Sequence, residues 1–171
     1  MQTVDFTSKG IRIVALDERQ LGLLLEDQAL LFAELGLPAQ VFEDTDMLIK
    51  VSTSHCLREM KKAGPDWPYS AIWLGIETET GLIVADFMLK TGLDSTGAVE
   101  IGYGVHGQNE GRGVMTRTVA CLLDWARNHS KIKRIKAETL RSNIASMRVL
   151  EKNGFREFVP LDESVWWERR V

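Results

Sequence analysis

The stretch of sequence that decides the fold reads EIGYGVHGQNEGRGVMT and runs from Glu100 to Thr116. Up to Val105, large apolar side chains alternate with glycines and a carboxylate, which is the period of a strand. From Val114 onward the apolar residues recur at helical spacing, and a glycine-rich loop separates the two patterns. The stretch therefore predicts a strand, a glycine-rich loop and a helix in direct succession.

Two phosphate-binding motifs overlap in this loop. Gly102, Gly104 and Gly107 form a GxGxxG, but a dinucleotide fingerprint must end a strand and open a helix at once. Here the third glycine is followed by more loop. The acidic residue at about the right distance downstream, Asp124, falls within a helical pattern instead of ending a strand. The context therefore argues against dinucleotide binding by this motif.

The second motif is a QxxGxG formed by Gln108, Gly111 and Gly113, and it leads directly into the helix that begins near Val114. The N–H groups of a helix's first turn have no partner within the helix and lie at its positive end. Glycines allow a diphosphate to approach this main chain without meeting a Cβ atom. The motif predicts an anionic ligand; the alternative is a glycine-rich turn that only connects strand and helix.

The rest of the chain predicts a mixed sheet with helices on its faces. Upstream we expect a strand over 11–15, an amphipathic helix carrying Leu21 to Leu35, a weaker helix over 45–62, and strands over 71–77, 82–90 and 98–105. Downstream we expect a helix over 114–128, a strand over 135–139, a helix from Ser142 or Asn143 to Gly154, and strands over 155–159 and 165–169. The three middle strands are expected to form an antiparallel meander, and residues 1–171 a single α+β domain.

Composition narrows the class of protein. The chain has 171 residues, 44% of them hydrophobic and 26% charged, as in an ordinary globular domain. Lys and Arg number 21 against 24 Asp and Glu, and the net charge of −3 is opposite in sign to that of a typical nucleic-acid binder. The sequence contains no run of about 18 apolar residues and no signal-peptide pattern in Met1–Gly10. We therefore expect neither nucleic acid nor a membrane as a partner.

The two cysteines, Cys56 and Cys121, lie far apart in apolar surroundings and without a CxxC partner. Such a pattern predicts neither a disulfide framework nor a zinc site. We expect a cytoplasmic protein that holds no metal.

Three segments together resemble the GNAT acetyltransferase superfamily, in particular its branch of ribosomal-protein N-terminal acetyltransferases. They are the strand VEIGYGV at 99–105, the QxxGxG at 108–113 and the segment NIASMRVLEKNGF at 143–155. The resemblance implies a central sheet in which one strand splays from its neighbour, with acetyl-CoA as co-substrate in the gap. It implies direct acetyl transfer to a primary amine, either a protein N-terminus or a small amine such as a polyamine, antibiotic or amino acid.

By the same resemblance, particular residues would hold acetyl-CoA. Its pyrophosphate would be bound by Gln108, Asn109, Gly111, Arg112 and Gly113. Its pantetheine arm would be met by the main chain of Tyr103 and Val105 and by the side chain of Asn143. Asn143 also has a purely structural alternative as a helix N-cap.

Glu100 is the candidate general base. It shares one face of its strand with Gly102 and Gly104, and glycines weaken a strand unless something passes close to the backbone there. A carboxylate at such a place can take the proton of an acceptor amine, directly or through a water. The alternative is an ordinary solvated glutamate.

Ser146 is the candidate acid that protonates the departing thiolate. Members of the resembling family often use a tyrosine of the last helix for this step, but the aligned position here is Leu150. Ser146, one helical turn earlier, matches the serine of the ribosomal-type branch. The alternatives are a serine that bonds only to its own helix and a thiolate that leaves without acid help. The missing tyrosine also leaves open a non-catalytic acyl-CoA-binding module as the alternative function.

The acceptor site is the part that the sequence defines least. We expect it among the N-terminal helices, the loop around Trp67 and Tyr69, and the last two strands. Trp166 and Trp167 are adjacent and in a strand point to opposite faces, so one of them is expected at the acceptor pocket or in a homodimer contact. His106 is expected to be structural or to lie next to the phosphates.

Overall fold

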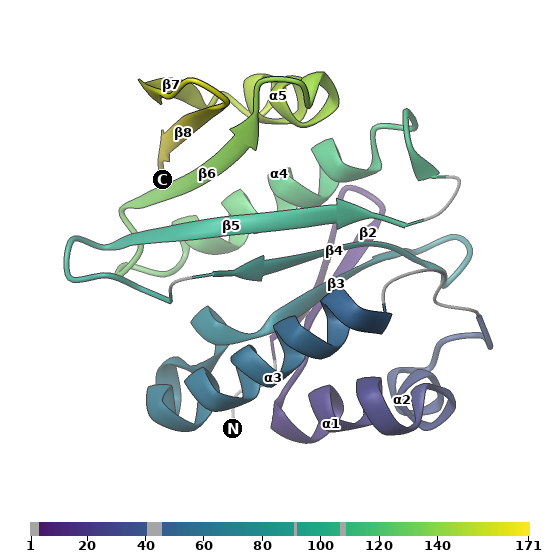
Figure 1. Ribbon diagram of the computed structural model, residues 1–171. Helices are drawn as coiled ribbons and strands as arrows, with labels where there is room; N and C mark the ends of the chain where they lie inside the picture. Colours follow the sequence, from purple (N-terminus) through teal and green to yellow (C-terminus); the bar gives the residue numbers. More distant parts are fainter. Residues whose placement is uncertain (1–3, 41–45, 91, 107–108) are drawn as a thin grey trace.

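The strands form one mixed sheet. In the computed structural model, which describes residues 4–40, 46–90, 92–106 and 109–171, the strand order is β1-β2-β3-β4-β5-β6-β8-β7 (Figure 1). The strands are β1 Asp5–Ser8, β2 Ile11–Ala15, β3 Ile72–Glu77, β4 Ile83–Leu89, β5 Ala98–Val105, β6 Arg134–Leu140, β7 Arg156–Pro160 and β8 Ser164–Arg170. The helices are α1 Glu18–Glu26, α2 Gln28–Leu35, α3 Asp46–Ala63, the 3-10 helix η1 Gly64–Ser70, α4 Val114–Arg127 and α5 Ile144–Lys152. The predicted α+β class is confirmed, and β3, β4 and β5 form the predicted antiparallel meander.

The strands β5 and β6 separate along their length. They pair in parallel from Ala98, opposite Arg134, to Ile101, opposite Ala137. Beyond these residues β5 continues to Val105 and β6 continues to the end of its own range, so the two strands diverge toward their carboxyl ends. The expected splay of the strand that precedes the glycine-rich loop is therefore present.

Helix α4 covers one face of the sheet because its apolar stripe packs against β3 and β4. Trp125 of α4 meets Trp73 of β3 with ring centroids 4.7 Å apart, and Trp73 stacks on Phe87 of β4 at 5.2 Å. The helix approaches so closely that a Cβ atom at Gly75 of β3 would lie 3.2 Å from the hydroxyl oxygen of Thr118. A glycine at this position therefore lets the helix lie against the sheet.

The helices α1, α2 and α3 lie on the opposite face from α4, as Figure 1 shows. The prediction of one helix from Leu21 to Leu35 is wrong, because Asp27 divides it into α1 and α2. Asp27 has a φ of −152°, and its carboxylate accepts a hydrogen bond of 3.0 Å from the main-chain N–H of Leu30, which starts a second helix. The sequence analysis also missed β1, which pairs with β2 at the edge of the sheet.

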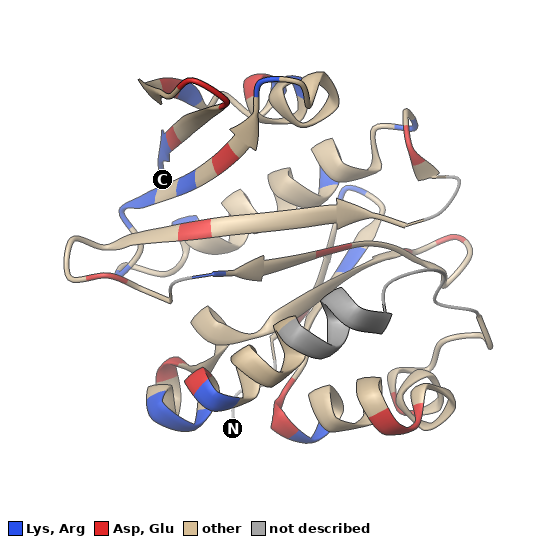
Figure 2. Cartoon of the chain, in the orientation of Figure 1, with Lys and Arg blue, Asp and Glu red and all other residues tan. Residues whose placement is uncertain are grey.

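Charged side chains of both signs are interspersed over the elements that Figure 2 colours. Within the ranges described, no helix combines the length and the apolar character needed to cross a membrane. The surface of the described elements thus carries mixed charge, as the near balance of acidic and basic residues indicates.

Candidate functional site

A cavity of about 450 Å³ lies between the end of β5, the glycine-rich loop and α5. We call it the loop cavity. It is lined by seven of the predicted site residues, namely Tyr103, Val105, Asn109, Gly111, Gly113, Asn143 and Ser146. The predicted residue Gln108 lies outside the described residues. Segments far apart in the sequence thus meet at the place where the resemblance implies acetyl-CoA.

The main chain at the start of α4 borders the loop cavity. Gly113, the N-cap of α4, has a φ of 71° and Gly111 a φ of 72°, a left-handed conformation that side chains rarely adopt. No side chain caps this end of α4, and a Cβ atom at either glycine would meet no described atom within 4 Å. The positive end of a 14-residue helix therefore faces open space, an arrangement that suits a phosphate.

Two basic residues of α5 also line the loop cavity, and the sequence analysis missed them. Arg148 and Lys152 are exposed and lie four residues apart, so they share one side of the helix. Cations that border the same cavity as a positive helix end favour an anionic ligand. The signal in the sequence was this basic i,i+4 spacing in the helix that carries Ser146.

A second cavity, of about 480 Å³, lies between the sheet and the helices α1 and α3. We call it the sheet cavity. Its lining includes Gly102 and Gly104, so the strand face predicted to be bare does face a cavity. Four residues line both cavities: Tyr103, Gly104, Asn143 and Ser146. The two cavities therefore adjoin at these four residues.

Tyr103 and Ser146 form a hydrogen-bonded pair at this junction. The hydroxyl oxygens are 2.7 Å apart, and the Tyr103 hydroxyl also donates to the main-chain oxygen of Ser146 at 3.3 Å. Burial raises the pKa of Tyr103 to about 12, although the hydrogen bond with Ser146 acts in the opposite direction. The phenol thus stays protonated at neutral pH and holds the serine hydroxyl between β5 and α5.

Glu100 lies on the predicted face of β5 but lines neither cavity. Its carboxylate forms an ion pair of 3.0 Å with the ammonium group of Lys90, and only 16% of its side chain is exposed. Gly102 makes room for this contact, since a Cβ atom there would lie 2.6 Å from Cε of Lys90. The Glu100 carboxylate is therefore already engaged by a cation.

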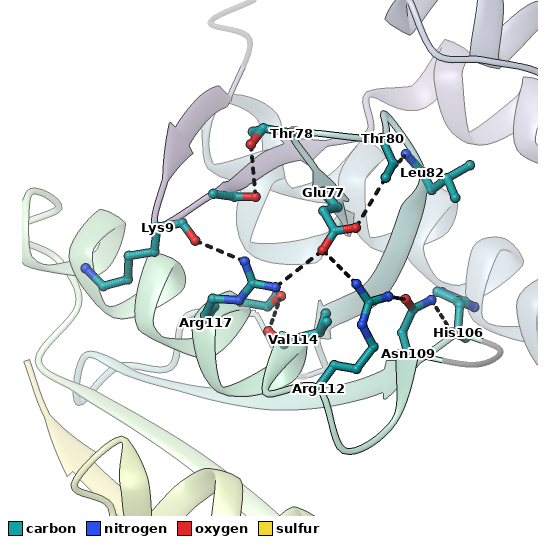
Figure 3. A network of polar contacts seen from close by, with 12 residues as sticks. Lys9, Glu77, Thr78, Thr80, Leu82, His106, Asn109, Arg112, Val114 and Arg117 are labelled. Carbon is teal, nitrogen blue, oxygen red and sulfur yellow. Dashed lines mark hydrogen bonds and ion pairs between the residues drawn. The ribbon is translucent and has the colours of Figure 1, made fainter.

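Arg112 lies in the predicted loop, but it is not among the residues that line the loop cavity. One of its guanidinium nitrogens lies 3.4 Å from the Glu77 carboxylate, and the other donates to the side-chain oxygen of Asn109 at 2.8 Å (Figure 3). Arg117 of α4 reaches the same oxygen of Glu77 at 3.5 Å. Asn109 in turn donates to the main-chain oxygen of His106 at 2.6 Å. These contacts join the loop and α4 to the end of β3.

Asn143 is the N-cap of α5. Its side-chain oxygen accepts a hydrogen bond of 3.0 Å from the main-chain N–H of Ser146. The alternative role of Asn143 as a helix N-cap is therefore present in the structure. Asn143 also lines both cavities, and its contact with the pantetheine arm stays a prediction.

Asp86 and His106 are two titratable residues at the site that the sequence analysis did not assign to catalysis. Asp86 of β4 lines the sheet cavity, and its Oδ1 lies 3.8 Å from Nε2 of His106. Burial raises the pKa of Asp86, while His106 and main-chain hydrogen bonds act against this shift. Burial also lowers the pKa of His106, with Asp86 acting against it. No sequence signal marked Asp86, because it is an isolated acidic residue in an apolar strand.

The loop around Trp67 and Tyr69 is not at the sheet cavity. Both residues belong to η1 and line a separate cavity of about 620 Å³, together with β1 and the end of α4. Trp167 is buried and donates from its indole to the Thr139 hydroxyl at 2.9 Å. The ring centroid of Trp166 lies 6.4 Å from that of Phe158. Neither the η1 loop nor the last two strands line the sheet cavity, contrary to the expected composition of the acceptor site.

Among the described residues, no group of three or more His, Cys, Asp or Glu side chains is arranged so that it could hold a metal ion.

The splayed sheet and the glycine-rich start of α4 define the class of fold, and comparison with known proteins identifies the family. Residues 29–156 match the acetyltransferase (GNAT) domain family. The chain belongs to this family.

Individual relatives are similar over different extents. Over 57 residues, 33% of the chain, the sequence is 42% identical to the probable N-acetyltransferase YjcK of Bacillus subtilis (strain 168), and this stretch spans 32% of that relative. The structure of ribosomal-protein-S5-alanine acetyltransferase from Vibrio fischeri is similar with a TM-score of 0.65 at 13% identity, over 98% of this chain and 96% of that chain. RimL, a ribosomal L7/L12 alpha-N-protein acetyltransferase in complex with coenzyme A, has a TM-score of 0.65 at 16% identity, over 99% of this chain and 98% of that one. At such identities the likeness to the solved structures shows the fold.

Proposed function

We propose that the protein transfers the acetyl group of acetyl-CoA directly to a primary amine, which is a protein N-terminus or a small amine. The observation that carries this proposal is the pair of cavities on either side of Tyr103 and Ser146. One cavity has the features of a phosphate-binding donor site, and the other offers an acceptor access to the same point. A pocket for the donor alone would not need the second cavity.

The residues of the loop cavity fit acetyl-CoA. The main-chain N–H groups at Gly111, Gly113 and the start of α4 lie where no side chain blocks a pyrophosphate. Arg148 and Lys152 add positive charge on the opposite wall. The end of β5, which has diverged from β6, presents Tyr103 and Val105 to the same cavity and offers main-chain groups to the pantetheine arm.

The chain's side chains then have distinct tasks in the transfer. The acceptor nitrogen forms a bond to the thioester carbonyl carbon, the bond from that carbon to sulfur breaks, and one proton must leave the nitrogen. The Ser146 hydroxyl, held by Tyr103, is placed to donate a hydrogen bond and a proton to the departing thiolate. Glu100 is the base that the sequence predicts, and its ion pair with Lys90 sets it back from both cavities.

Two of the similar structures belong to enzymes named for ribosomal proteins, and one of them is named an alpha-N-protein acetyltransferase. Polypeptide N-termini are therefore the acceptors to test first, beside polyamines, antibiotics and amino acids. The lining of the sheet cavity combines apolar side chains with the charged residues Asp86, Lys90 and Glu138 and the polar residues Ser52, Tyr103, Thr139, Asn143 and Ser146. An amine in this cavity would therefore meet both apolar surface and polar groups.

The test combines binding with turnover. The protein is mixed with acetyl-CoA and each acceptor, and free CoA thiol is followed while calorimetry measures the affinity for acetyl-CoA. Thiol release that depends on an acceptor and yields the acetylated amine is the expected result. Binding of acetyl-CoA without turnover on any acceptor would instead identify a non-catalytic acyl-CoA-binding module, and lack of binding would contradict both functions.

A further inference from the structure

Asp86 lies beside a residue that lines both cavities. It lies on β4 directly opposite Gly104 of β5, and Gly104 lines both cavities. A Cβ atom at Gly104 would lie 3.1 Å from Oδ1 of Asp86, so the glycine leaves the space that this carboxylate occupies. The absence of a side chain at Gly104 therefore allows the Asp86 carboxylate to lie close to the backbone of β5.

Glu100, the base that the sequence predicts, lies further from the junction of the two cavities than Asp86 does. In the antiparallel pairing of β4 and β5, Gly102 stands opposite Met88, so the Lys90–Glu100 contact lies further from the junction than the Asp86–Gly104 pair. The carboxylate of Glu100 is already paired with an ammonium group at 3.0 Å. The Asp86 carboxylate lies 3.8 Å from Nε2 of His106 and also accepts a main-chain hydrogen bond from Gly104.

Burial gives the Asp86 carboxylate increased basicity. Burial raises the pKa of Asp86 and lowers that of His106, which favours the uncharged imidazole beside it. Lys90, which directly follows β4, and Glu138 of β6 are the other charged residues that line the sheet cavity. The neighbouring α1, α3 and β3 contribute Leu24, Ser52, Ile72 and Leu74 to the lining, none of which titrates.

We infer that Asp86 is the general base that accepts the proton of the acceptor amine, an inference that rests on the proposed acetyl transfer. As the nitrogen bonds to the carbonyl carbon, its excess proton passes to a carboxylate oxygen of Asp86. The carbon–sulfur bond breaks, and the departing thiolate takes its proton from the Ser146 hydroxyl. Asp86 then releases its proton to solvent and Ser146 regains one from solvent, so that protons balance over the cycle.

The kinetic test compares three variants with wild type. Asp86→Asn keeps the size of the side chain and is expected to lower kcat/KM for the amine by about a hundredfold or more, the usual effect of losing a positioned base. Its affinity for acetyl-CoA should stay within about twofold of wild type, because the loop cavity is not altered. Glu100→Gln is expected to have a much smaller effect. Asp124→Asn, which changes a carboxylate paired with Lys9 on the far side of α4, is the matched control.

The pH profile gives the second part of the test. In wild type, kcat/KM should fall on the acid side as Asp86 takes up a proton, and the midpoint should lie above the ordinary aspartate value because burial raises the pKa of Asp86. Asp86→Asn should lose this acid limb, whereas Glu100→Gln should keep it.

A readout that needs neither substrate is the melting temperature as a function of pH. A carboxyl whose pKa is raised by folding stabilises the fold below its unfolded pKa, and this stability is lost as the pH rises through the folded value. Asn carries no such loss. The melting temperature of Asp86→Asn relative to wild type should therefore rise between pH 4 and pH 8.

The outcomes separate the inference from the function on which it rests. Turnover by wild type, with Asp86→Asn as active as wild type, or with the acid limb lost only in Glu100→Gln, overturns the role of Asp86 and leaves acetyl transfer intact. A difference in melting temperature that does not change with pH also overturns it, because Asp86 would then not be the base with a raised pKa. Absence of turnover by wild type with every acceptor refutes the proposed function and the base with it.

Discussion

Glu77 is expected to control acetyl-CoA affinity from outside the loop cavity. It is buried at the end of β3, with 10% of its side chain exposed, and its carboxylate faces the guanidinium groups of Arg112 and Arg117 (Figure 3). The substitution Glu77→Gln removes the charge but keeps the size and an oxygen that can accept the hydrogen bond from Thr80. It thus tests the ion pairs with little change in packing.

The size of the expected loss of acetyl-CoA affinity follows from how exposed Arg112 and Arg117 are. The side chains of Arg112 and Arg117 are 54% and 36% exposed, and their nitrogens lie 3.4 and 3.5 Å from Glu77. Pairs so open to solvent contribute about 0.2 to 1 kcal/mol each. Losing both ion pairs should destabilise the ordered conformation of the loop by about 1 kcal/mol. If acetyl-CoA binds this conformation, its Kd should rise about fivefold.

The assay is calorimetric binding of acetyl-CoA to wild type, Glu77→Gln, Arg112→Gln and the double variant. If Arg112 acts by anchoring the loop to Glu77, each single substitution weakens binding, and the double variant is hardly weaker than Glu77→Gln alone, because both remove one interaction. Glu79→Gln, at an exposed position just beyond β3, is the matched control and should bind as wild type does.

A different result would refute this reasoning. If Arg112 binds the pyrophosphate, as the sequence resemblance implies, Glu77→Gln frees the guanidinium group and affinity stays the same or rises. Arg112→Gln then weakens binding in both backgrounds, and its effect adds to that of Glu77→Gln. The same set of four proteins therefore distinguishes an anchoring arginine from a ligand-binding one.

Three further predictions concern the two cavities. Gly113→Asn adds a side chain to the proposed phosphate site, and Asn is a residue type that tolerates the left-handed backbone. The affinity for acetyl-CoA should therefore fall by at least about tenfold in calorimetry, with little change in melting temperature. Equal losses of affinity for acetyl-pantetheine, which has no pyrophosphate, would contradict a pyrophosphate site at Gly113. Ser146→Ala and Tyr103→Phe should each lower kcat with acetyl-CoA affinity nearly retained, and a kcat within about twofold of wild type would mean that water protonates the thiolate. Replacing Arg148 and Lys152 together by Gln should weaken acetyl-CoA binding and reduce its dependence on salt concentration; an unchanged salt dependence would remove these cations from the phosphate site.

The glycine-rich start of α4 could be predicted because its determinants are local. A glycine pattern followed at once by helical periodicity specifies both the open main chain and the direction of the helix that follows it. Gly111 and Gly113 do adopt the left-handed conformation and border the loop cavity. The basic pair Arg148 and Lys152 was visible as an i,i+4 spacing, but its meaning depended on which face of α5 turns toward the loop.

The helix from Leu21 to Leu35 shows where local reasoning failed. The apolar spacing was continuous, so periodicity alone predicted one helix. The Asp27 side chain caps the turn that follows it and so interrupts the helix, and α1 and α2 then pack against each other.

The sequence by itself predicted most of the strands and helices, the alternating faces of β5 and the glycine-rich start of α4, because each follows from residues within a few positions of one another. Only the tertiary structure decided which side chains meet. Tyr103 and Ser146 are separated by 43 residues, and Arg112 and Glu77 by 35. Asp86 faces the sheet cavity because β4 pairs with β5 in one register, and a shift by one residue would turn its side chain to the other face. That register depends on burying the apolar faces of the whole sheet, a property of the assembled core and not of any single segment.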